Sequence, residues 1–401
     1  MKEENMIEQA QQILLDALKA SLFETTFSYS DDTEWDAVIK EAKSQAVMGL
    51  ISPVIPVHDE SSDQGKVFYM RLLHEQDKLL NLFDEHSIPC VILKGCAAAI
   101  YYPKPFLRAM GDVDFLVRRN QFEEAMKLME SNGYVYSHGK NDDGSLAFNS
   151  RHIGYYKNGI EFELHHHFSS TGFNMDDILE KSIDKREYRE LNGHSFPVLP
   201  KVENGLVLLG HLYQHLKKDE LGLRQIIDWE MYVHSALNED RCKKEFASIA
   251  KELGLLDLAI NVTLMCEKHL GLTKTIKRNV SATEEIADEL LDNLLTSGNF
   301  GSKQLTLSEY SGERIRAVTG TIKSKGLFLY FQDNGLETWK LCKKYPVLKP
   351  LAFIYGFFRF CIRGILGVLK TGKFKQQISY VRKKKHYDKE LGIRKKEERS
   401  K

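Results

Sequence analysis

The chain contains 401 residues, 42% hydrophobic and 28% charged, which is enough to bury a sizeable core and to form two or three domains. It begins with an acidic helical pattern rather than an apolar signal segment, and its six cysteines are scattered without Cys-x-x-Cys spacing. These features exclude the pattern of an exported, disulfide-stabilised protein and lead us to expect a cytoplasmic enzyme.

Apolar residues at helical spacing mark the first part of the chain. Ranges 5–22 and 34–51 repeat them every three or four positions, which predicts two amphipathic helices. We assign residues 1–65 to an N-terminal helical cap. A further amphipathic helix follows and leads into the central unit, which we place at 66–200.

A tight turn between a strand and a helix forms the first candidate binding element. Pro89–Leu93 is predicted to be a short buried strand, and the alanine-rich run that ends at Pro103 is predicted to be a helix. Lys94 and Gly95 lie between them. The first amides of a helix have no partners within it and lie at the positive end of its dipole, so a phosphate binds there. With the charge of Lys94 added, the sequence predicts an anion site at this turn.

Two aspartates one residue apart enter the next apolar run. Because side chains at i and i+2 of a strand share a face, Asp112 and Asp114 should present their carboxylates side by side. Such charges repel each other, and a divalent cation between them keeps both ionised at neutral pH. A strand end with two solvated acids is the alternative. Gly111 precedes the pair, and Arg108 lies close enough to contact a triphosphate or the acids, although a surface arginine is also compatible with the pattern.

A third acid follows on a later strand. After a predicted helix at 121–132 and a polar loop at 137–149, the run 159–165 alternates between apolar and polar residues. Its polar face carries Glu163 and His165. Histidine is a poor magnesium ligand, so we expect His165 to orient Glu163 or a phosphate. A phosphate-binding turn, an Asp-x-Asp and a third acid on neighbouring strands is the arrangement that two-metal phosphoryl chemistry needs.

From about residue 201 the apolar spacing is helical, and we assign 201–300 to a helical domain that lines one side of the site. His211 and His215 share one helix face. A zinc pair is one interpretation, and hydrogen-bonding or core histidines are the commoner one. Arg224 and Asp228 also lie four residues apart, which by default gives an intrahelical ion pair worth a few tenths of a kcal/mol.

Together these stretches resemble the nucleotidyltransferase-fold proteins of the DNA polymerase beta superfamily, and more closely their bacterial branch of uncharacterised nucleotidyltransferases. The matching motifs, spread over about 65–235, are Ile92-Leu-Lys94-Gly95, Tyr102-Pro103, Arg108-x-x-Gly111-Asp112-x-Asp114-x-Leu-Val117, Glu163-Leu-His165, and His211-x-x-x-His215 followed by Arg224-x-x-x-Asp228. The resemblance implies an α+β fold, a mixed β-sheet with flanking helices between an N-terminal helical cap and a C-terminal helical domain.

The resemblance also implies a reaction, the Mg²⁺- or Mn²⁺-dependent transfer of a nucleoside monophosphate from an NTP such as ATP to the hydroxyl of an unknown acceptor. The catalytic and metal-binding residues would be Asp112, Asp114 and Glu163, and the nucleotide-binding residues Lys94, Gly95, Arg108 and Gly111. Beside the metals or on the acceptor side would lie His165, His211, His215, Arg224 and Asp228. Lys94-Gly95 replaces the usual Gly-Ser or Gly-Gly, which leaves open a protein that binds nucleotides without catalysis.

The C-terminal region, 301–401, is basic. From Lys340 to Lys401 there are 19 Lys and Arg against 4 Asp and Glu, so this tail carries about +15 and the rest of the chain about −15. The apolar run 351–369 holds two arginines and three glycines, which disfavours a membrane span and leaves a helix packed on the protein or lying on a membrane surface. Peripheral membrane contact through 351–385 would suit the alternative function, an accessory protein in surface-polymer or peptide-product biosynthesis. Nucleic acid is disfavoured as a partner because aromatic residues are sparse along the basic run.

Overall fold

The computed structural model describes residues 2–137, 152–168, 175–218, 220–237, 240–273, 284–299 and 346–359, together with Phe328, Phe331, Gln332, Leu336 and Trp339. Residue contacts divide the chain into two compact units, Met1–Lys303 with Leu391–Lys401 and Gln304–Glu390. The predicted loop at 137–149, except Ser137, and most of the segment 351–385 lie outside the described residues. Our division of the chain into four parts stays a prediction.

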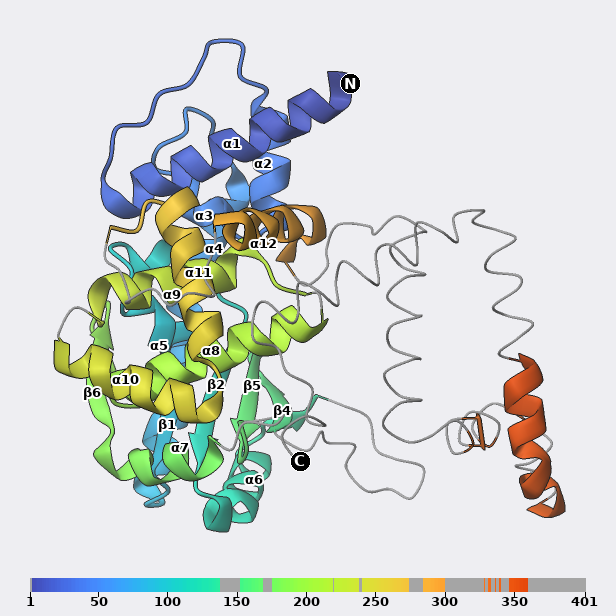
Figure 1. Ribbon diagram of the computed structural model, residues 1–401. Helices are drawn as coiled ribbons and strands as arrows, with labels where there is room; N and C mark the ends of the chain where they lie inside the picture. Colours follow the sequence, from blue (N-terminus) through green and yellow to red (C-terminus); the bar gives the residue numbers. More distant parts are fainter. Residues whose placement is uncertain are drawn as a thin grey trace. The chain divides into compact units, whose positions relative to one another are not determined.

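A seven-stranded mixed sheet organises the first unit (Figure 1). The strands are β1 (Cys90–Leu93), β2 (Asp112–Val117), β3 (Val135–Tyr136), β4 (His152–Lys157), β5 (Ile160–His165), β6 (Glu187–Leu191) and β7 (His194–Val198). Their order across the sheet is β3-β4-β5-β2-β1-β7-β6. β2 pairs in parallel with β5 and β1 with β7, and the other neighbours are antiparallel. The predicted fold, a mixed sheet with flanking helices, is confirmed.

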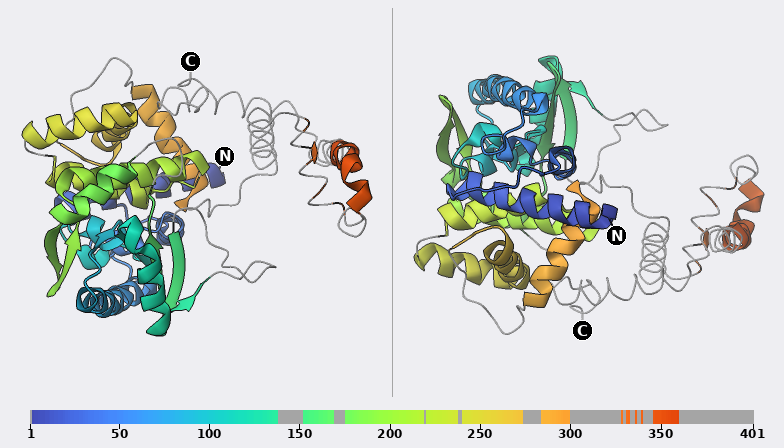
Figure 2. Two further views of the ribbon diagram at one scale, coloured as in Figure 1. Left: turned by 90° about the horizontal axis from the view of Figure 1, so that it is seen from below. Right: turned by 90° about the horizontal axis from the view of Figure 1, so that it is seen from above.

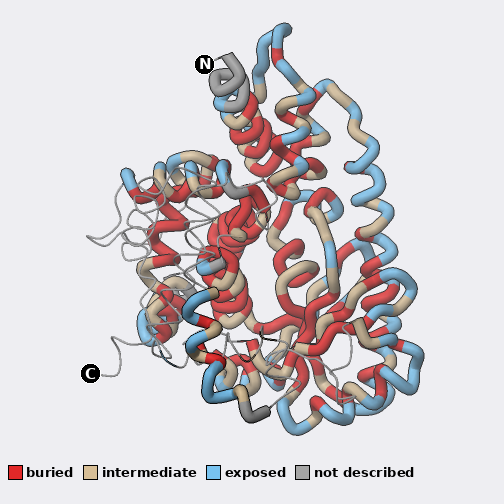
Figure 3. Tube along the Cα trace, turned by 90° about the vertical axis from the view of Figure 1, so that its right-hand side faces the viewer, coloured by how far each residue is buried: buried red, intermediate tan, exposed pale blue. Residues whose placement is uncertain are grey.

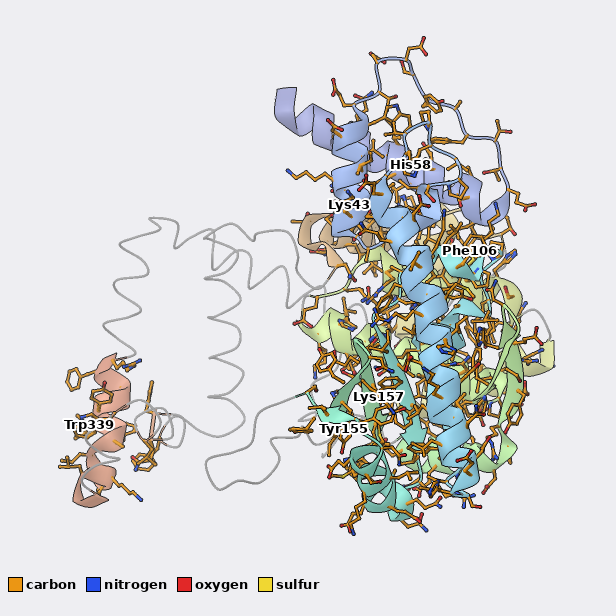
Figure 4. The ribbon with its side chains drawn as sticks, turned by 180° about the vertical axis from the view of Figure 1, so that it is seen from behind. Lys43, His58, Phe106, Tyr155, Lys157 and Trp339 are labelled. Carbon is orange, nitrogen blue, oxygen red and sulfur yellow. The ribbon has the colours of Figure 1, made fainter. Side chains whose placement is uncertain are left out.

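The apolar face of the sheet packs on two helices, α4 (Glu60–Glu85) and α6 (Phe122–Ser131). Alternation along the strands directs Phe115 of β2 and Phe162 of β5 to this face, where both are fully buried. Phe83 of α4 meets Phe115 edge to face, with ring centroids 5.4 Å apart. Figure 4 shows α4 lying along the sheet, with Tyr155 of β4 beside it. The same alternation leaves the acids of β2 and β5 on the opposite face.

Helices cover the rest of the first unit. They are α1 (Lys2–Phe23), α2 (Trp35–Ser44), α3 (Met48–Ile51), α5 (Gly95–Ala99), α7 (Asp176–Ser182), α8 (Lys201–Lys218), α9 (Leu223–Ser235), α10 (Asp240–Leu253), α11 (Leu256–His269) and α12 (Glu284–Ser297). Figure 2 shows the order of the layers, from α10 through α8 and α9 to the sheet and then α4. The predicted helix 34–51 is wrong in one respect, because it breaks into α2 and α3 around Ala46, which has a φ of 54°.

The helix α9 forms the centre of the helical layer. Ten of its thirteen residues are buried, among them Trp229 and the acidic Asp228 and Glu230. Figure 3 shows buried positions gathered inside the first unit, with exposed positions mostly around its outside. The polar face of the sheet is therefore covered by a helix that itself brings charged side chains into the interior.

The described part of the second unit is a short aromatic segment. A 3₁₀ turn at Pro346–Leu351 leads into helical residues 352–359. The side chain of Gln332 accepts a hydrogen bond from the amide of Phe353 and donates one to the carbonyl of Lys349. Of the helices in the described ranges, none combines the length and the hydropathy needed to cross a bilayer.

Candidate active site

The register of the central strands brings the predicted acids together. β2 lies between β1 and β5, and Asp114 is the direct neighbour of Glu163 in the parallel β2–β5 ladder. Asp112 lies two residues before Asp114, on the same face. One carboxylate oxygen from each of the three residues lies within 4.8 Å of the other two. The three side chains that the sequence assigns to metal binding thus converge.

Lys94 projects into this cluster of acids. It lies between β1 and α5 with a φ of 46° and a ψ of −129°, a conformation rare for residues other than glycine. Its Nζ is 2.6 Å from Asp114 Oδ1 and 3.9 Å from Glu163 Oε2. Burial alone would lower the pKa of Lys94, but the charges of the surrounding acids raise it above its ordinary value. Lys94 is therefore an ammonium ion. α5 has only five residues and is shorter than the helix that we predicted as far as Pro103.

Two histidines of β4 and β5 lie next to the acids. Both strands are on the other side of β2 from β1, the strand that precedes Lys94. His165 Nε2 lies 2.8 Å from Asp114 Oδ1 and 3.3 Å from Glu163 Oε2. This contact agrees with the orienting role that the sequence suggests for His165. His152 Nε2 lies 3.4 Å from Glu163 Oε1. His152 is not among the site residues predicted from the sequence, although the Asn158-Gly159 pair is a signal for a two-residue hairpin whose register places residue 152 opposite 165.

The protonation of the acids depends on these neighbours. Burial raises the pKa of Asp112, and the nearby charge of Asp114 raises it further. Burial also disfavours ionised Glu163, but its hydrogen bond with His165 and the charge of Lys94 outweigh that effect and leave the pKa of Glu163 below its ordinary value. For His165 burial lowers the pKa, and the contacts with the two carboxylates raise it by more, so the net shift is upward. Lys94 and His165 thus favour the ionised form of Glu163, whereas the ionised form of Asp112 is disfavoured.

The cluster opens into a cavity of about 200 Å³. Its lining includes every residue predicted to bind the nucleotide, namely Lys94, Gly95, Arg108 and Gly111. α8 and α9 contribute His211, Gln214, His215 and Arg224 from the opposite side. Of the residues predicted for the site, Asp228 alone does not line the cavity.

Asp228 of α9 connects the helical layer to the segment that precedes β2 through hydrogen bonds with two side chains. Its Oδ1 accepts hydrogen bonds from Arg108 Nε at 2.7 Å and from the Tyr102 hydroxyl at 2.7 Å, and its Oδ2 accepts one from Arg108 Nη2 at 2.6 Å. The remaining Arg108 nitrogen, Nη1, donates to the carbonyl of Ala109. The guanidinium therefore fixes the backbone that leads into β2, and the carboxylate of α9 determines where it lies. By default the sequence predicts an ion pair between Asp228 and Arg224 within one helix. The hydrogen bonds of Asp228 go instead to Arg108 and Tyr102.

His211 and His215 hydrogen-bond to each other across one turn of α8. Their Nε2 atoms are 2.8 Å apart. Burial, together with the charge of Lys94, holds the pKa of His211 well below its ordinary value, so its ring is neutral. Among the described residues, the groups able to hold a metal ion do not include this pair. The pair, of which His211 is neutral, lines the side of the cavity that faces the acids.

Comparison with known proteins gives one family match. A family described as uncharacterised nucleotidyltransferases matches residues 31–271, which is more than half of the chain. A solved structure of an antigenic nucleotidyltransferase-like protein from Paracoccidioides brasiliensis is 13% identical and covers 49% of this chain and 92% of its own, with a TM-score of 0.27. That TM-score adds nothing to the assignment. No protein of curated function matches the sequence. On the family match, the chain belongs to the uncharacterised nucleotidyltransferases.

Proposed function

We propose that the protein is a metal-dependent nucleotidyltransferase, which moves a nucleoside monophosphate from an NTP to a hydroxyl-bearing acceptor. The observation that carries the proposal is the convergence of Asp112, Asp114 and Glu163 within 4.8 Å at the edge of a cavity. An all-oxygen donor set suits Mg²⁺ or Mn²⁺. When bound, such an ion makes an acceptor hydroxyl more acidic and neutralises charge on the phosphates.

Other residues of the site would bind the phosphates, position the acids and line the acceptor side. Lys94 brings a fixed positive charge to the phosphate side, and its contact with Asp114 is one that a phosphate oxygen can replace. The guanidinium of Arg108 is already bound to Asp228, so we propose that it acts by holding the segment 109–111, which carries Asp112. The neutral His211 and the cationic Arg224 line the acceptor side. No side chain of the protein needs to act as a nucleophile.

The test uses the position of the label in the NTP. In an extract of the source cell, protein incubated with Mg²⁺ and α-³²P-labelled NTPs should transfer label to a product, whereas γ-³²P-labelled NTPs should release it as pyrophosphate. Asp112→Asn and Glu163→Gln should both abolish transfer. Glu161→Gln is the matched control, because Glu161 is also a carboxylate of β5 and lies outside the convergent group of acids.

Two results would reject the proposal. Transfer of the γ label in place of the α label would indicate a kinase, and equal activity of the wild type and the Asp112→Asn variant would remove the acids from the reaction. A protein that binds Mg-NTP in calorimetry yet releases no pyrophosphate would instead be the nucleotide-binding alternative. The built-in Lys94–Asp114 contact favours that alternative, because it already neutralises one ligand of the proposed metal.

We further propose that the second unit contacts an anionic membrane surface. Ile354, Phe357 and Phe358 are each at least 40% exposed, and Lys349 and Arg359 flank them. Flotation with vesicles of phosphatidylserine and phosphatidylcholine should recover the wild-type chain, and Phe357→Ser combined with Phe358→Ser should reduce recovery. Equal flotation on vesicles of phosphatidylcholine alone would reject the electrostatic part of this proposal.

A further inference from the structure

A metal site made of carboxylates alone does not use the nitrogen atoms of the two imidazoles beside it as ligands. We propose that His152, His165 and Glu163 form a second divalent-cation site, which prefers a nitrogen-binding transition ion such as Zn²⁺ or Co²⁺ over Mg²⁺. Glu163 belongs to both groups of ligands, so the two sites share one carboxylate. The proposal concerns cation binding and does not depend on which reaction the protein catalyses.

The sheet register places the three donors on one face. His152 of β4 is the direct antiparallel neighbour of His165 of β5, and Glu163 lies two residues before His165 on the same side. Gly154 stands opposite Glu163, so no side chain of β4 separates the carboxylate from His152. The two rings lie with centroids 4.8 Å apart in an edge-to-face arrangement. Backbone pairing alone thus brings two imidazoles and one carboxylate together.

The distances between donor atoms fit the edges of a metal coordination shell. His165 Nε2 is 3.3 Å from Glu163 Oε2, and His152 Nε2 is 3.4 Å from Glu163 Oε1. Both exceed the usual length of an N–H···O hydrogen bond, which is about 2.9 Å. Ligands bound at about 2.1 Å lie roughly 3.0–3.4 Å apart in octahedral or tetrahedral geometry. Two of the three edges thus already have this length, the donor nitrogens of the two imidazoles lie within 4.8 Å of each other, and His165 Nε2 exchanges its 2.8 Å contact with Asp114 for the ion.

The donor types decide which ion this is. Mg²⁺ takes oxygen ligands and dehydrates reluctantly, whereas imidazole nitrogen suits later transition ions such as Zn²⁺ and, as its spectroscopic substitute, Co²⁺. His165 is only 3% exposed, and His152 and Glu163 are 15% and 19% exposed at the side chain, so the donors are shielded but reachable from the cavity. Asp114 Oδ1, 2.8 Å from His165 Nε2, is a further oxygen at the boundary of the two sites. The geometry thus gives a hard site and a nitrogen-containing site side by side.

The experiment is a Co²⁺ titration of full-length protein from which any histidine tag has been removed. Co²⁺ bound by nitrogen and oxygen donors gives visible absorption bands, and equilibrium dialysis gives the stoichiometry. In the wild type, one Co²⁺ should bind with visible bands that survive a large excess of Mg²⁺. His152→Ala should weaken this binding by roughly 100-fold, at least as much as the loss of an outer-shell partner of a metal ligand. His152→Gln, which keeps more of the side-chain volume, guards against a folding defect, and circular dichroism checks both variants.

Further variants separate the two sites. Asp112→Asn should retain the Co²⁺ bands and lose Mg²⁺ binding, whereas Glu163→Gln should weaken both. His58→Ala is the matched control, because His58 is 72% exposed at the side chain and lies outside the cluster. Absence of Co²⁺ bands in the wild type, full displacement by Mg²⁺, or equal binding by His152→Ala would overturn the proposal. Because no NTP is present, failure of the transferase assay leaves these results standing, and failure here leaves the transferase proposal standing.

Discussion

Two buried ion pairs flank the candidate site, and they hold their partners differently. On the helical side, Arg108 and Asp228 make two parallel hydrogen bonds, and Tyr102 adds a third. On the sheet side, Lys94 and Asp114 meet through a single contact of 2.6 Å, and Asp114 shares the same oxygen with His165. The shortest contact in each pair is equally long, so length does not distinguish them.

The difference lies in what surrounds each carboxylate. Asp228 is enclosed and saturated with donors, so no ligand reaches it from the cavity. Asp114 lines the cavity, and its lysine partner comes from a turn with an unfavourable backbone conformation. A buried ion pair with two hydrogen bonds and no access from the cavity, such as Arg108–Asp228, stabilises the fold. An ion pair with one contact that faces the cavity, such as Lys94–Asp114, can exchange one partner for a ligand. The comparison predicts different outcomes when each pair is broken.

The largest expected effect is on stability, from Asp228→Ala. The substitution leaves the guanidinium of Arg108 buried without its carboxylate, which typically costs about 3–5 kcal/mol. Urea unfolding followed by circular dichroism should show this loss. Asp184→Ala is the control, because Asp184 pairs with Arg118 at the surface and its side chain is 64% exposed, so its loss should cost less than about 1 kcal/mol. Equal costs for the two variants would contradict the structural role of the Arg108–Asp228 pair.

The next effect is on activity, from Asp112→Asn. Loss of a metal ligand should slow nucleotidyl transfer by about 1000-fold or more, which corresponds to several kcal/mol of transition-state stabilisation. Because burial and Asp114 raise the pKa of Asp112, its ionised form is disfavoured in the metal-free fold. Asparagine removes that charge, so in EDTA the variant should be at least as stable as the wild type. A variant that is both inactive and strongly destabilised would place Asp112 with the structural pair instead.

The site residues on the sheet could be predicted from the sequence, because the direction of a side chain in a strand depends only on its position along that strand. Alternation alone predicts that Asp112 and Asp114 share a face, and that Glu163 lies on the polar side of its strand. The Lys94-Gly95 turn was equally visible, since it joins an apolar run to an alanine-rich one. Only the length of the helix that follows differs, because α5 ends at Ala99.

The contacts of the site residues on the helices could not be predicted in this way. Asp228 pairs with a residue 120 positions away, and helical periodicity carries no information about such partners. Almost all of α9 is buried, so the apolar stripe that normally marks the inner face is absent. Ala46 also ends α2 without glycine or proline to signal the break. His152 is the intermediate case, since the Asn158-Gly159 turn determines its partner but only once the hairpin has been recognised.

A moderate effect is expected from Lys94→Met. The ammonium group lies 2.6 Å from an oxygen that the proposed cation needs, so it opposes metal binding when no nucleotide is present. Its removal should raise Mg²⁺ affinity in titration calorimetry by about tenfold, or about 1.4 kcal/mol, and should weaken binding of the NTP. Lys104→Met serves as the control, since Lys104 is exposed and does not line this cavity. Weaker Mg²⁺ binding by Lys94→Met would show that the lysine supports the acids instead of competing for them.

The smallest effect is on the pH dependence of stability, and its sign differs between the two sides of the cavity. Contacts with Asp114 and Glu163 outweigh burial and raise the pKa of His165 above 6.5 in the fold, so its stabilising contribution is full below pH 6.5 and is lost as pH rises through the folded value. Burial and the charge of Lys94 lower the pKa of His211, so the fold loses stability as pH falls below 6.5, where the unfolded chain takes up the proton.

Urea unfolding in EDTA at pH 5.5 and pH 8 measures both contributions. His165→Gln should cost more stability at pH 5.5 than at pH 8, and His211→Gln should cost more at pH 8 than at pH 5.5. Both variants replace a buried imidazole by an amide, so packing losses affect the two pH values equally and leave the difference to protonation. If the stability cost of both variants changed with pH in the same direction, the comparison would fail. The acids around His165 and the cationic Lys94 near His211 would then not shift the two pKa values in opposite directions.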